Sequence, residues 1–420
     1  MSCSEWKESK LGEISLKITK GSTPTTLDSE FSDKGIKFYR SECLTDSRII
    51  DKNKAKYISK ETYDKMKRSQ LFENDILFSM AGAYLGKTSI VMKDDIPANI
   101  NQAVAIIRPD CESISYRYLY YYLNQKRVVE YVNNISSQSA QPNINLKQIG
   151  EIPIKYPKLE EQEKIADVLS FLDDKIELNN EMNKTLEEMA QSIFKRWFVD
   201  FEFPNEDGQP YKSSGGEMVE SELGMIPKGW KVTNIDDICM KVTSGGTPSR
   251  KNKDYYDGDI IWIKTKELND TFVFDSEEKI SSIGLEKSSA KLFPSKTVMI
   301  AMYGATVGKL GISSTMITFN QATCGMVVNT EACCYEYLYL HLINQREKLK
   351  NLAIGSAQQN LSVSVIKEYN IIKPIKQVME KFKNVINPIY DKIECNQNNI
   401  QNLKSLRDEL LPKLMRNEIK

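Results

Sequence analysis

The sequence predicts a mixed α/β (α+β) protein of two pseudo-symmetric lobes joined by two long coiled-coil helices. Three observations lead to this prediction. The two halves of the chain repeat each other, each half begins with short β-rich runs separated by Gly, Pro, Asn and Ser turns, and each half ends in a long segment with apolar residues at heptad spacing. Strands and helices within one lobe indicate a mixed fold, and heptad spacing indicates helices that pair.

The repeat runs through most of the chain with an offset that shrinks only from 224 to 217 residues. A unit of this length far exceeds the roughly 20–50 residues of a solenoid repeat, so the chain holds two whole domains. The matching segments are 11–24 with 235–248, 80–87 with 302–309, 101–103 with 320–322, and 139–143 with 356–360. Two similar domains suggest two similar ligands.

Each lobe combines strands and a helix in its sequence pattern. Apolar runs over residues 75–79 and 103–108 predict strands, and residues 115–132 predict a helix. Residues 203–227 are acidic and rich in Gly, Ser and Pro, which is typical of a linker over the surface. We therefore predict a first lobe at 1–157, a first long helix at 158–199, a linker at 200–227, a second lobe at 228–375 and a second long helix at 376–416.

The two long helices are predicted from apolar residues with an alternating 4-3 spacing, which forms a seam along one side of a helix. The predicted seam includes Ile165, Leu169, Leu172, Ile176, Asn179, Leu186 and Ile193 in the first helix and Ile386, Ile393, Asn396, Ile400, Leu403 and Leu410 in the second. Arg407 is a charged exception on this seam. Pro388 also lies in the second seam, where proline should kink the helix or delay its start.

Asparagine occupies the same seam position in both helices, as Asn179 and Asn396. A polar seam residue lowers stability but fixes register, so we expect these residues to help align the pair. The alternative is that each faces solvent in a frayed stretch.

Charge is balanced over the chain, with 57 basic and 57 acidic residues, but its distribution is local. Residues 34–68 carry 11 Lys and Arg against five acids, as expected of a DNA-facing lobe on a neutral protein. The eight cysteines form no C-x-x-C pair and His341 is the single histidine, so we predict no metal site. Without a signal-like or membrane-spanning segment, we expect a soluble, cytoplasmic protein with no membrane contact.

Some short motifs resemble catalytic motifs, but the residues around them do not complete a catalytic site. Residues 81–88 fit a relaxed phosphate-binding loop, but the strict motif opens with glycine, and the second copy continues as Lys309-Leu310 without a hydroxyl for magnesium. Residues 387–390 resemble the base-holding loop of amino-methyltransferases, but they lie in the seam, and no glycine-rich S-adenosylmethionine turn is present. His341 has no evident partner for acid–base chemistry. We therefore predict no catalytic residue.

The sequence resembles the specificity subunits of type I restriction-modification systems over nearly its whole length. The resemblance rests on the duplicated architecture, on Ser-Ala-Gln-x-Asn followed by residues 152–165, on residues 186–201, and on Gly-Met-Ile-Pro-Lys-Gly-Trp at 224–230. The departures are Arg407, Pro388 and residues 374–380, which lack the Glu-Glu-Gln found at 160–162.

The resemblance implies two target recognition domains, each reading one half of a split asymmetric site in double-stranded DNA. Two antiparallel helices would fix the unread spacer, since a helix of about 35 residues extends roughly 50 Å, more than one turn of DNA. It further implies two methyltransferase subunits, which dock on the helical region and methylate adenine N6 with S-adenosylmethionine. Restriction/translocase subunits, which use ATP and magnesium, would join that complex. The chain itself is then expected to be non-catalytic and to bind no cofactor.

The DNA-contact candidates are positions that repeat between the lobes and have side chains suited to phosphate or base contacts. They are Gly21, Thr23, Arg40, Tyr84, Lys87, Gln102, Ser139 and Gln141 in the first lobe, and Gly245, Thr247, Lys264, Thr306, Lys309, Gln321, Ser356 and Gln358 in the second. Glycines would let the backbone approach phosphate, cations would neutralise it, and amides would hydrogen-bond base edges. The alternative is that Gly-x-Thr-Pro is only a turn and Asn101-Gln102 only caps a buried strand.

Two other functions stay open at this stage. One is an enzyme, either a separate nuclease or the severed recognition half of a fused restriction-methylation enzyme. The other is a scaffold or silent copy, which would assemble with methyltransferase subunits without sequence preference.

Overall fold

The computed structural model describes residues 6–24, 30–136, 143–353 and 360–418. The chain divides into two compact units, the first formed by Met1–Ile176 and Asn402–Lys420 and the second by Glu177–Gln401. Two long helices, α5 (Leu159–Phe194) and α11 (Lys376–Leu414), contribute to both units.

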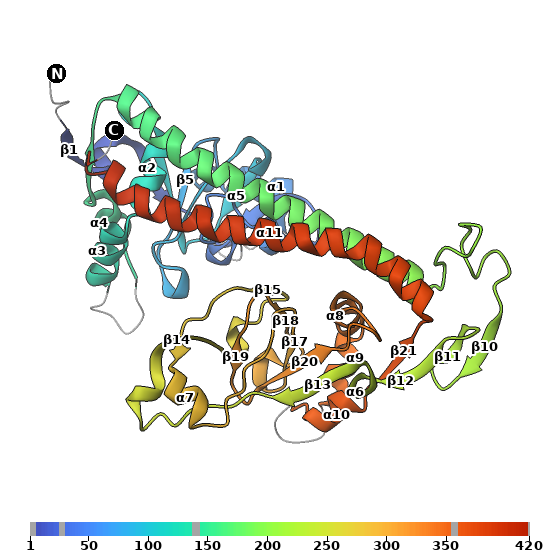
Figure 1. Ribbon diagram of the computed structural model, residues 1–420. Helices are drawn as coiled ribbons and strands as arrows, with labels where there is room; N and C mark the ends of the chain where they lie inside the picture. The colour runs from blue at the N-terminus through green and yellow to red at the C-terminus, as the bar shows by residue number, and fades with distance from the viewer. Residues whose placement is uncertain (1–5, 25–29, 137–142, 354–359, 419–420) are drawn as a thin grey trace. The chain divides into compact units, whose positions relative to one another are not determined.

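The first unit is built on three small sheets, with strands drawn mostly in blue in Figure 1. Its strands are β1 Lys7–Lys10, β2 Ser15–Lys20, β3 Ile36–Tyr39, β4 Lys56–Ile58, β5 Ile76–Ser79, β6 Thr88–Ile90, β7 Ala98–Ile100, β8 Val104–Pro109 and β9 Pro153–Tyr156. Its shorter helices are α1 Lys60–Lys65, α2 Tyr116–Leu123, α3 Lys126–Ser136 and α4 Leu146–Gly150. The strand orders are β2-β8-β5-β6, β4-β3-β7 and β1-β9.

The second unit repeats this plan with additions. Its strands are β10 Met218–Ser221, β11 Gly224–Pro227, β12 Lys231–Asn234, β13 Cys239–Ser244, β14 Tyr256–Ile263, β15 Thr271–Val273, β16 Lys279–Ile280, β17 Val298–Ala301, β18 Leu310–Ser313, β19 Thr318–Phe319, β20 Thr323–Val328 and β21 Asn370–Lys373. Its shorter helices are α6 Ile235–Ile238, α7 Ser282–Glu286, α8 Tyr335–Asn344, α9 Arg346–Leu352 and α10 Val363–Lys367. The orders β13-β20-β17-β18-β15, β16-β14-β19 and β12-β21 match those of the first unit, with β15 and the hairpin β10-β11 added. The predicted duplicated α/β fold is confirmed.

The same local interactions build both lobes. Strands β5 and β17 are buried along their whole length, as expected of apolar runs covered on both faces. Tyr118 of α2 donates its hydroxyl to the carbonyl of Lys155 (2.8 Å), and Tyr337 of α8 donates to the carbonyl of Ile372. Each tyrosine thus fastens a lobe helix to the strand that leads into the following long helix.

The helix predicted over residues 115–132 is interrupted. Helix α2 ends at Leu123 and α3 begins at Lys126. The side-chain amide of Asn124 donates to the carbonyl of Tyr120 (2.8 Å) and to the hydroxyl of Thr88 (2.6 Å). This use of the backbone carbonyl by a side chain accounts for the end of the first helix.

Within the first unit, α5 and α11 pack antiparallel along the predicted seam. Ile165 and Leu169 share one core cluster with Leu411 and Leu414, and Leu172 and Ile176 are also buried, whereas Leu403 and Leu410 are half-buried. The charged position is accommodated by pairing, because Arg407 Nη1 donates to Asp173 Oδ1 over 2.8 Å.

Within the second unit the same helices pack with a polar contact at their centre. Ile386, Ile393 and Ile400 are buried, and Leu186 and Ile193 are half-buried. Asn396 is fully buried and donates its amide to Asn183 Oδ1 (2.8 Å), not to Asn179, which is half-buried. Antiparallel pairing explains the difference, because equivalent positions of two antiparallel helices do not face each other.

The structure corrects one expectation about the second long helix and adds detail to the predicted linker. Helix α11 begins at Lys376 and continues through Pro388, so the predicted delay does not occur. One missing N–H is tolerated where buried neighbours such as Ile386 and Tyr390 hold both sides of the helix. The predicted linker is ordered: after α5 and a π-helical turn at Lys195–Val199, Phe203 stacks on Trp230 with centroids 5.0 Å apart, and the β10-β11 hairpin follows.

Candidate nucleic-acid interface

Most of the first-lobe candidates gather around one turn, residues 101–103, between β7 and β8. Backbone hydrogen bonds tie this turn to three other segments: Asn101 N donates to Tyr39 O (3.1 Å), Met80 N to Ala103 O (2.8 Å), and Gly21 N to Val104 O (3.3 Å). The segments that follow Tyr39, Met80 and Gly21 carry Arg40, the glycine loop and Thr23. The fold therefore brings together candidates from four separate parts of the sequence.

The second unit reproduces these bonds at the equivalent positions. Asn320 N donates to Ile263 O (3.0 Å), Met302 N to Ala322 O (2.8 Å), and Gly245 N to Thr323 O (3.1 Å). The chain thus builds the same loop cluster twice.

A threonine and a glutamine form the same side-chain pair in both clusters. The Thr23 hydroxyl donates to Gln102 Oε1, and the Thr247 hydroxyl donates to Gln321 Oε1. Both glutamines are exposed, and each amide oxygen is held by the threonine. This arrangement directs the amide NH₂ outward as a donor for an acceptor on a ligand.

The two glycines that precede these threonines have an internal role. A Cβ at Gly21 would lie 2.0 Å from the carbonyl oxygen of Ile100, and one at Gly245 would lie 1.9 Å from that of Phe319. Both glycines are buried. Their small size is therefore required by the chain's own backbone, and the expected approach of these glycines to a phosphate stays a prediction.

The loops predicted to approach phosphate are exposed turns between strands. Gly82 and Gly304 have φ angles of +68° and +69°, with no neighbouring atom within 4 Å of a Cβ placed on either. Each loop connects two strands, β5 to β6 and β17 to β18, so neither leads into the helix N-terminus that a nucleotide phosphate loop uses. The exposed backbone remains able to approach a polyanion.

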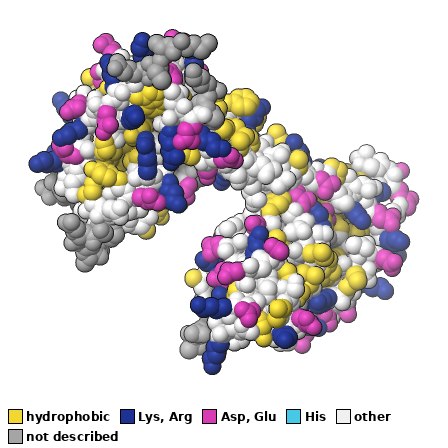
Figure 2. Space-filling view, turned by 60° about the vertical axis from the view of Figure 1, so that its left-hand side comes forward, with side chains coloured by type: hydrophobic (Ala, Val, Ile, Leu, Met, Phe, Trp, Pro, Cys, Tyr) yellow, Lys and Arg dark blue, Asp and Glu magenta, His cyan; other side chains and the backbone are white. Residues whose placement is uncertain are grey.

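The lysines of these loops are partly neutralised. Lys87 Nζ lies 3.1 Å from Asp46 and 5.7 Å from the centroid of the Tyr84 ring. Lys309 Nζ lies 3.6 Å from Asp270. In the same unit, Thr306 donates its hydroxyl to a backbone carbonyl over 3.3 Å. On the face seen in Figure 2, basic and acidic side chains are interspersed in the same way.

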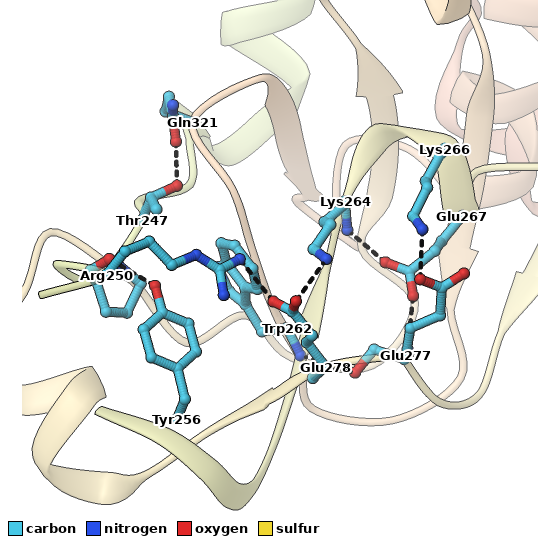
Figure 3. A network of polar contacts seen from close by, with 12 residues as sticks. Thr247, Arg250, Tyr256, Trp262, Lys264, Lys266, Glu267, Glu277, Glu278 and Gln321 are labelled. Atoms are coloured by element: carbon cyan, nitrogen blue, oxygen red, sulfur yellow. Dashed lines mark hydrogen bonds and ion pairs between the residues drawn. The ribbon is translucent and has the colours of Figure 1, made fainter. Parts of the chain in front are cut away.

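The equivalent cations Arg40 and Lys264 differ in their surroundings. Arg40 pairs with Glu42 at 2.5 Å. Lys264 pairs with Glu278 at 2.9 Å and lies 5.7 Å from the centroid of Trp262. Figure 3 shows this part of the second unit, where Glu278 also contacts Arg250, a residue that the sequence reasoning did not select. The signal available in the sequence was the interleaving of Arg250, Tyr256, Trp262 and Lys264, which is typical of nucleic-acid surfaces.

Four candidates, Ser139, Gln141, Ser356 and Gln358, lie outside the described residues. The chain next to them is attached to the glycine loops. Ile144 N donates to Met80 O (2.9 Å), and Leu361 N donates to Met302 O (2.8 Å).

His341 lies in an aromatic setting without an acid–base partner in the described part of the chain. Its ring lies 6.1–6.5 Å from the centroids of Phe194, Tyr337 and Tyr369, and its Nε2 has no hydrogen-bond partner there. Burial, with a contribution from Lys348, lowers the pKa of His341 to about 4. Residues 6–24, 30–136, 143–353 and 360–418 hold no cluster of three or more His, Cys, Asp or Glu side chains placed for a metal, and no helix among them is long and apolar enough to cross a membrane.

Comparison with known proteins identifies the family of the chain. The family described as type I restriction modification DNA specificity domain matches residues 3–188 and 227–405. This chain belongs to that family. Its role within the family is DNA sequence specificity and not catalysis.

Two full-length relatives and one solved structure of this specificity family illustrate the match. The type I restriction enzyme MjaIX specificity subunit of Methanocaldococcus jannaschii is 28% identical over 419 residues, covering 99% of this chain and 94% of that protein. The HindI specificity subunit of Haemophilus influenzae is 27% identical over 476 residues, covering 99% and 100%. The S subunit from M. genitalium has a TM-score of 0.61 at 14% identity, covering 98% of this chain and 96% of that one, which supports the fold.

Proposed function

We propose that this specificity subunit reads a bipartite, asymmetric DNA site, one half with each unit, and directs adenine N6 methylation and DNA cleavage by partner subunits. The observation that carries the proposal is the loop cluster built twice. Each copy presents an exposed glutamine amide held by threonine, an exposed glycine turn and a nearby cation. Amides and cations suit base edges and phosphates, respectively.

Residues that the two loop clusters share and residues that differ between them suit different kinds of DNA contact. Every duplex offers the same phosphates, so the residues that repeat between the clusters suit backbone contacts. Two different half-sites require different base contacts, so the residues that differ between the clusters suit sequence reading. The interspersed acidic side chains limit non-specific binding, because they reduce the net attraction of each surface for the polyanion.

The outer face of α5 supports docking of the two methyltransferase subunits. In the first unit, Val168 and Phe171 are 46% and 59% exposed and lie three residues apart. This spacing places them next to each other on the helix surface, apart from the buried seam residues, and such an exposed apolar stripe suits a further packed helix. S-adenosylmethionine would bind the methyltransferase subunits, and ATP with magnesium the restriction/translocase subunits, in the cytoplasm.

Modified-base sequencing tests the proposal directly. DNA from cells that express this chain with its methyltransferase subunit is compared with DNA from cells lacking this chain. We expect N6-methyladenine at one split motif only when the chain is present, and exchange of residues 1–157 for another lobe should change one half of that motif. Methylation that does not depend on the chain would favour the scaffold alternative, and cleavage or methylation by the purified chain alone would favour an enzyme.

The docking surface is tested with a matched pair of variants in one unit. Phe171→Glu places a charge on the α5 stripe, whereas Leu16→Glu places one at another exposed apolar residue, 70% exposed on β2. We expect Phe171→Glu to reduce co-purification of the methyltransferase subunit and Leu16→Glu to leave it unchanged. Equal co-purification with both variants would contradict docking on this stripe.

A further inference from the structure

A group of five side chains in the second unit, which we call the Arg250 cluster, has the geometry of a base-reading device. It consists of Arg250, Tyr256, Trp262, Lys264 and Glu278 (Figure 3). The Arg250 guanidinium carbon lies 4.3 Å from the centroid of the Tyr256 ring and 5.2 Å from that of the Trp262 ring. The two rings therefore limit where the guanidinium group can lie.

Both rings are themselves fixed by hydrogen bonds to the loop that carries Arg250. The Tyr256 hydroxyl donates to the carbonyl of Pro248 (2.6 Å), and Trp262 Nε1 donates to the carbonyl of Gly246 (3.0 Å). Trp262 is also almost fully buried, at 2% exposure. The aromatic platform is thus a rigid part of the lobe rather than a pair of mobile surface rings.

Glu278 completes the cluster by holding both cations. Its Oε2 accepts from Arg250 Nη2 (2.6 Å), and its Oε1 lies 2.9 Å from Lys264 Nζ. The Arg250 hydrogen bond, followed by that of Lys264, holds the pKa of Glu278 below its usual range. One carboxylate therefore stays ionised between two positive groups and fixes the edge of the guanidinium that it contacts.

The rest of the guanidinium is available to a ligand. The Arg250 side chain is 54% exposed, and the bond to Glu278 uses only one of its N–H donors. A planar group held on rings, with outward-facing donors, matches the two acceptors that guanine presents in the major groove.

The first unit lacks this arrangement at the equivalent strand positions. Strand β3 has Phe38 where β14 has Trp262, and the ring packed on Phe38 is that of Phe31, with centroids 5.4 Å apart, so neither ring has a polar group for the hydrogen bonds that fix Tyr256 and Trp262. The strand register places Lys56 opposite Phe38, at the position where the second unit has Glu278. The cluster thus belongs to the part of the lobe that differs between the units, as a contact specific to one half-site must.

We propose that Arg250 reads a guanine in the half-site bound by the second unit and that Glu278 is the positioning residue that aims it. This inference rests on the proposed DNA-reading function and deepens it. A carboxylate next to Arg250 disfavours a phosphate contact, because the two negative groups would repel each other. It does not disfavour the neutral edge of a base. Lys264, at 23% exposure, is the more enclosed cation and supports Glu278 from the other side.

The test is selection of DNA duplexes by the full chain assembled with its methyltransferase subunit, from a pool randomised in both half-sites. Arg250→Lys keeps the charge but loses the planar group. Glu278→Gln removes the negative charge that pairs with Arg250 and Lys264. The matched control is Glu277→Gln, which makes the same charge change at the neighbouring carboxylate, whose salt-bridge partner is Lys266.

We expect Arg250→Lys to lower the preference for one G·C pair in the second half-site by roughly tenfold or more. Glu278→Gln should lower the preference at the same pair by a smaller factor, whereas the first half-site and the Glu277→Gln variant keep the wild-type preference. An unchanged first half-site also shows that each variant is folded and assembled.

Two results would overturn the proposal in distinguishable ways. If Arg250→Lys or Glu278→Gln changes affinity equally for all sequences, Arg250 contacts phosphate and the base-reading role is rejected while the DNA-reading function stands. If the wild-type assembly selects no motif from the pool, the proposed function fails and the role of Arg250 fails with it.

Discussion

Replacing Arg407 with leucine should destabilise the first unit by about 3–5 kcal/mol, because the substitution leaves a buried carboxylate without its cationic partner. The side chain of Asp173 is only 6% exposed. Its Oδ1 accepts from Arg407 Nη1 at 2.8 Å, and its Oδ2 accepts from the Tyr121 hydroxyl at 2.7 Å. Leucine would suit the heptad seam by itself, but it would remove the guanidinium that neutralises the buried carboxylate of Asp173.

The opposite substitution should cost less. In Asp173→Asn the guanidinium of Arg407 keeps its contact with Asp408 at 2.9 Å and its 19% exposure to solvent. We expect a loss of about 1–3 kcal/mol, typical of one hydrogen bond to a charged group. Replacing both Asp173 and Arg407 with leucine should restore most of the stability, because an apolar pair continues the seam without any buried charge.

The assay is urea unfolding and thermal unfolding of the full chain and of the three variants, both followed by circular dichroism. For a unit of this size each kcal/mol corresponds to roughly 2–4 °C in Tm, so Arg407→Leu should lower the melting temperature of the first unit by about 6–20 °C. A loss below about 1 kcal/mol for Arg407→Leu, or a double variant no more stable than that single variant, would refute the reasoning that the pair is desolvated.

Three further predictions concern the second unit. Asn396→Leu should cost about 1–3 kcal/mol in urea unfolding because it leaves the amide of Asn183 buried and unpaired, and replacing both asparagines with leucine should recover that loss. Gly245→Ala should lower the melting temperature by several degrees, because its Cβ would lie 1.9 Å from the carbonyl oxygen of Phe319; an unchanged melting temperature would contradict that backbone contact. The pKa of His341 is lowered to about 4, so the contribution of this residue to stability should be constant above the ordinary value of 6.5 and fall by up to about 3 kcal/mol as the pH drops from 6.5 to 4, where the unfolded chain takes up a proton that the folded chain does not. The urea midpoint of a His341→Gln variant should lack this pH dependence, and equal slopes would reject it.

Local sequence patterns were sufficient for the architecture. A repeated spacing of residues is a property of the chain itself, so the duplication, the two lobes and the long helices followed from it. The same reasoning selected Thr23 with Gln102 and Thr247 with Gln321, because both members of each pair repeat at matching positions. It did not show that the members of each pair touch, since 79 and 74 residues separate them along the chain.

Contacts between distant segments required the tertiary structure. The heptad pattern marked Asn396 as a seam residue, but only the antiparallel packing of α5 against α11 chose Asn183 as its partner and placed Asp173 against Arg407. Glu278 gave no signal in the sequence, because an acidic residue in a bend just before a short strand has no distinguishing local pattern. Its role arises from a strand register that brings it next to Lys264 and within reach of Arg250. Spacing along the chain determines which faces are apolar and which segments repeat, whereas the identity of the partner across a helix pair or a sheet depends on register, which is set by the packing of the whole unit.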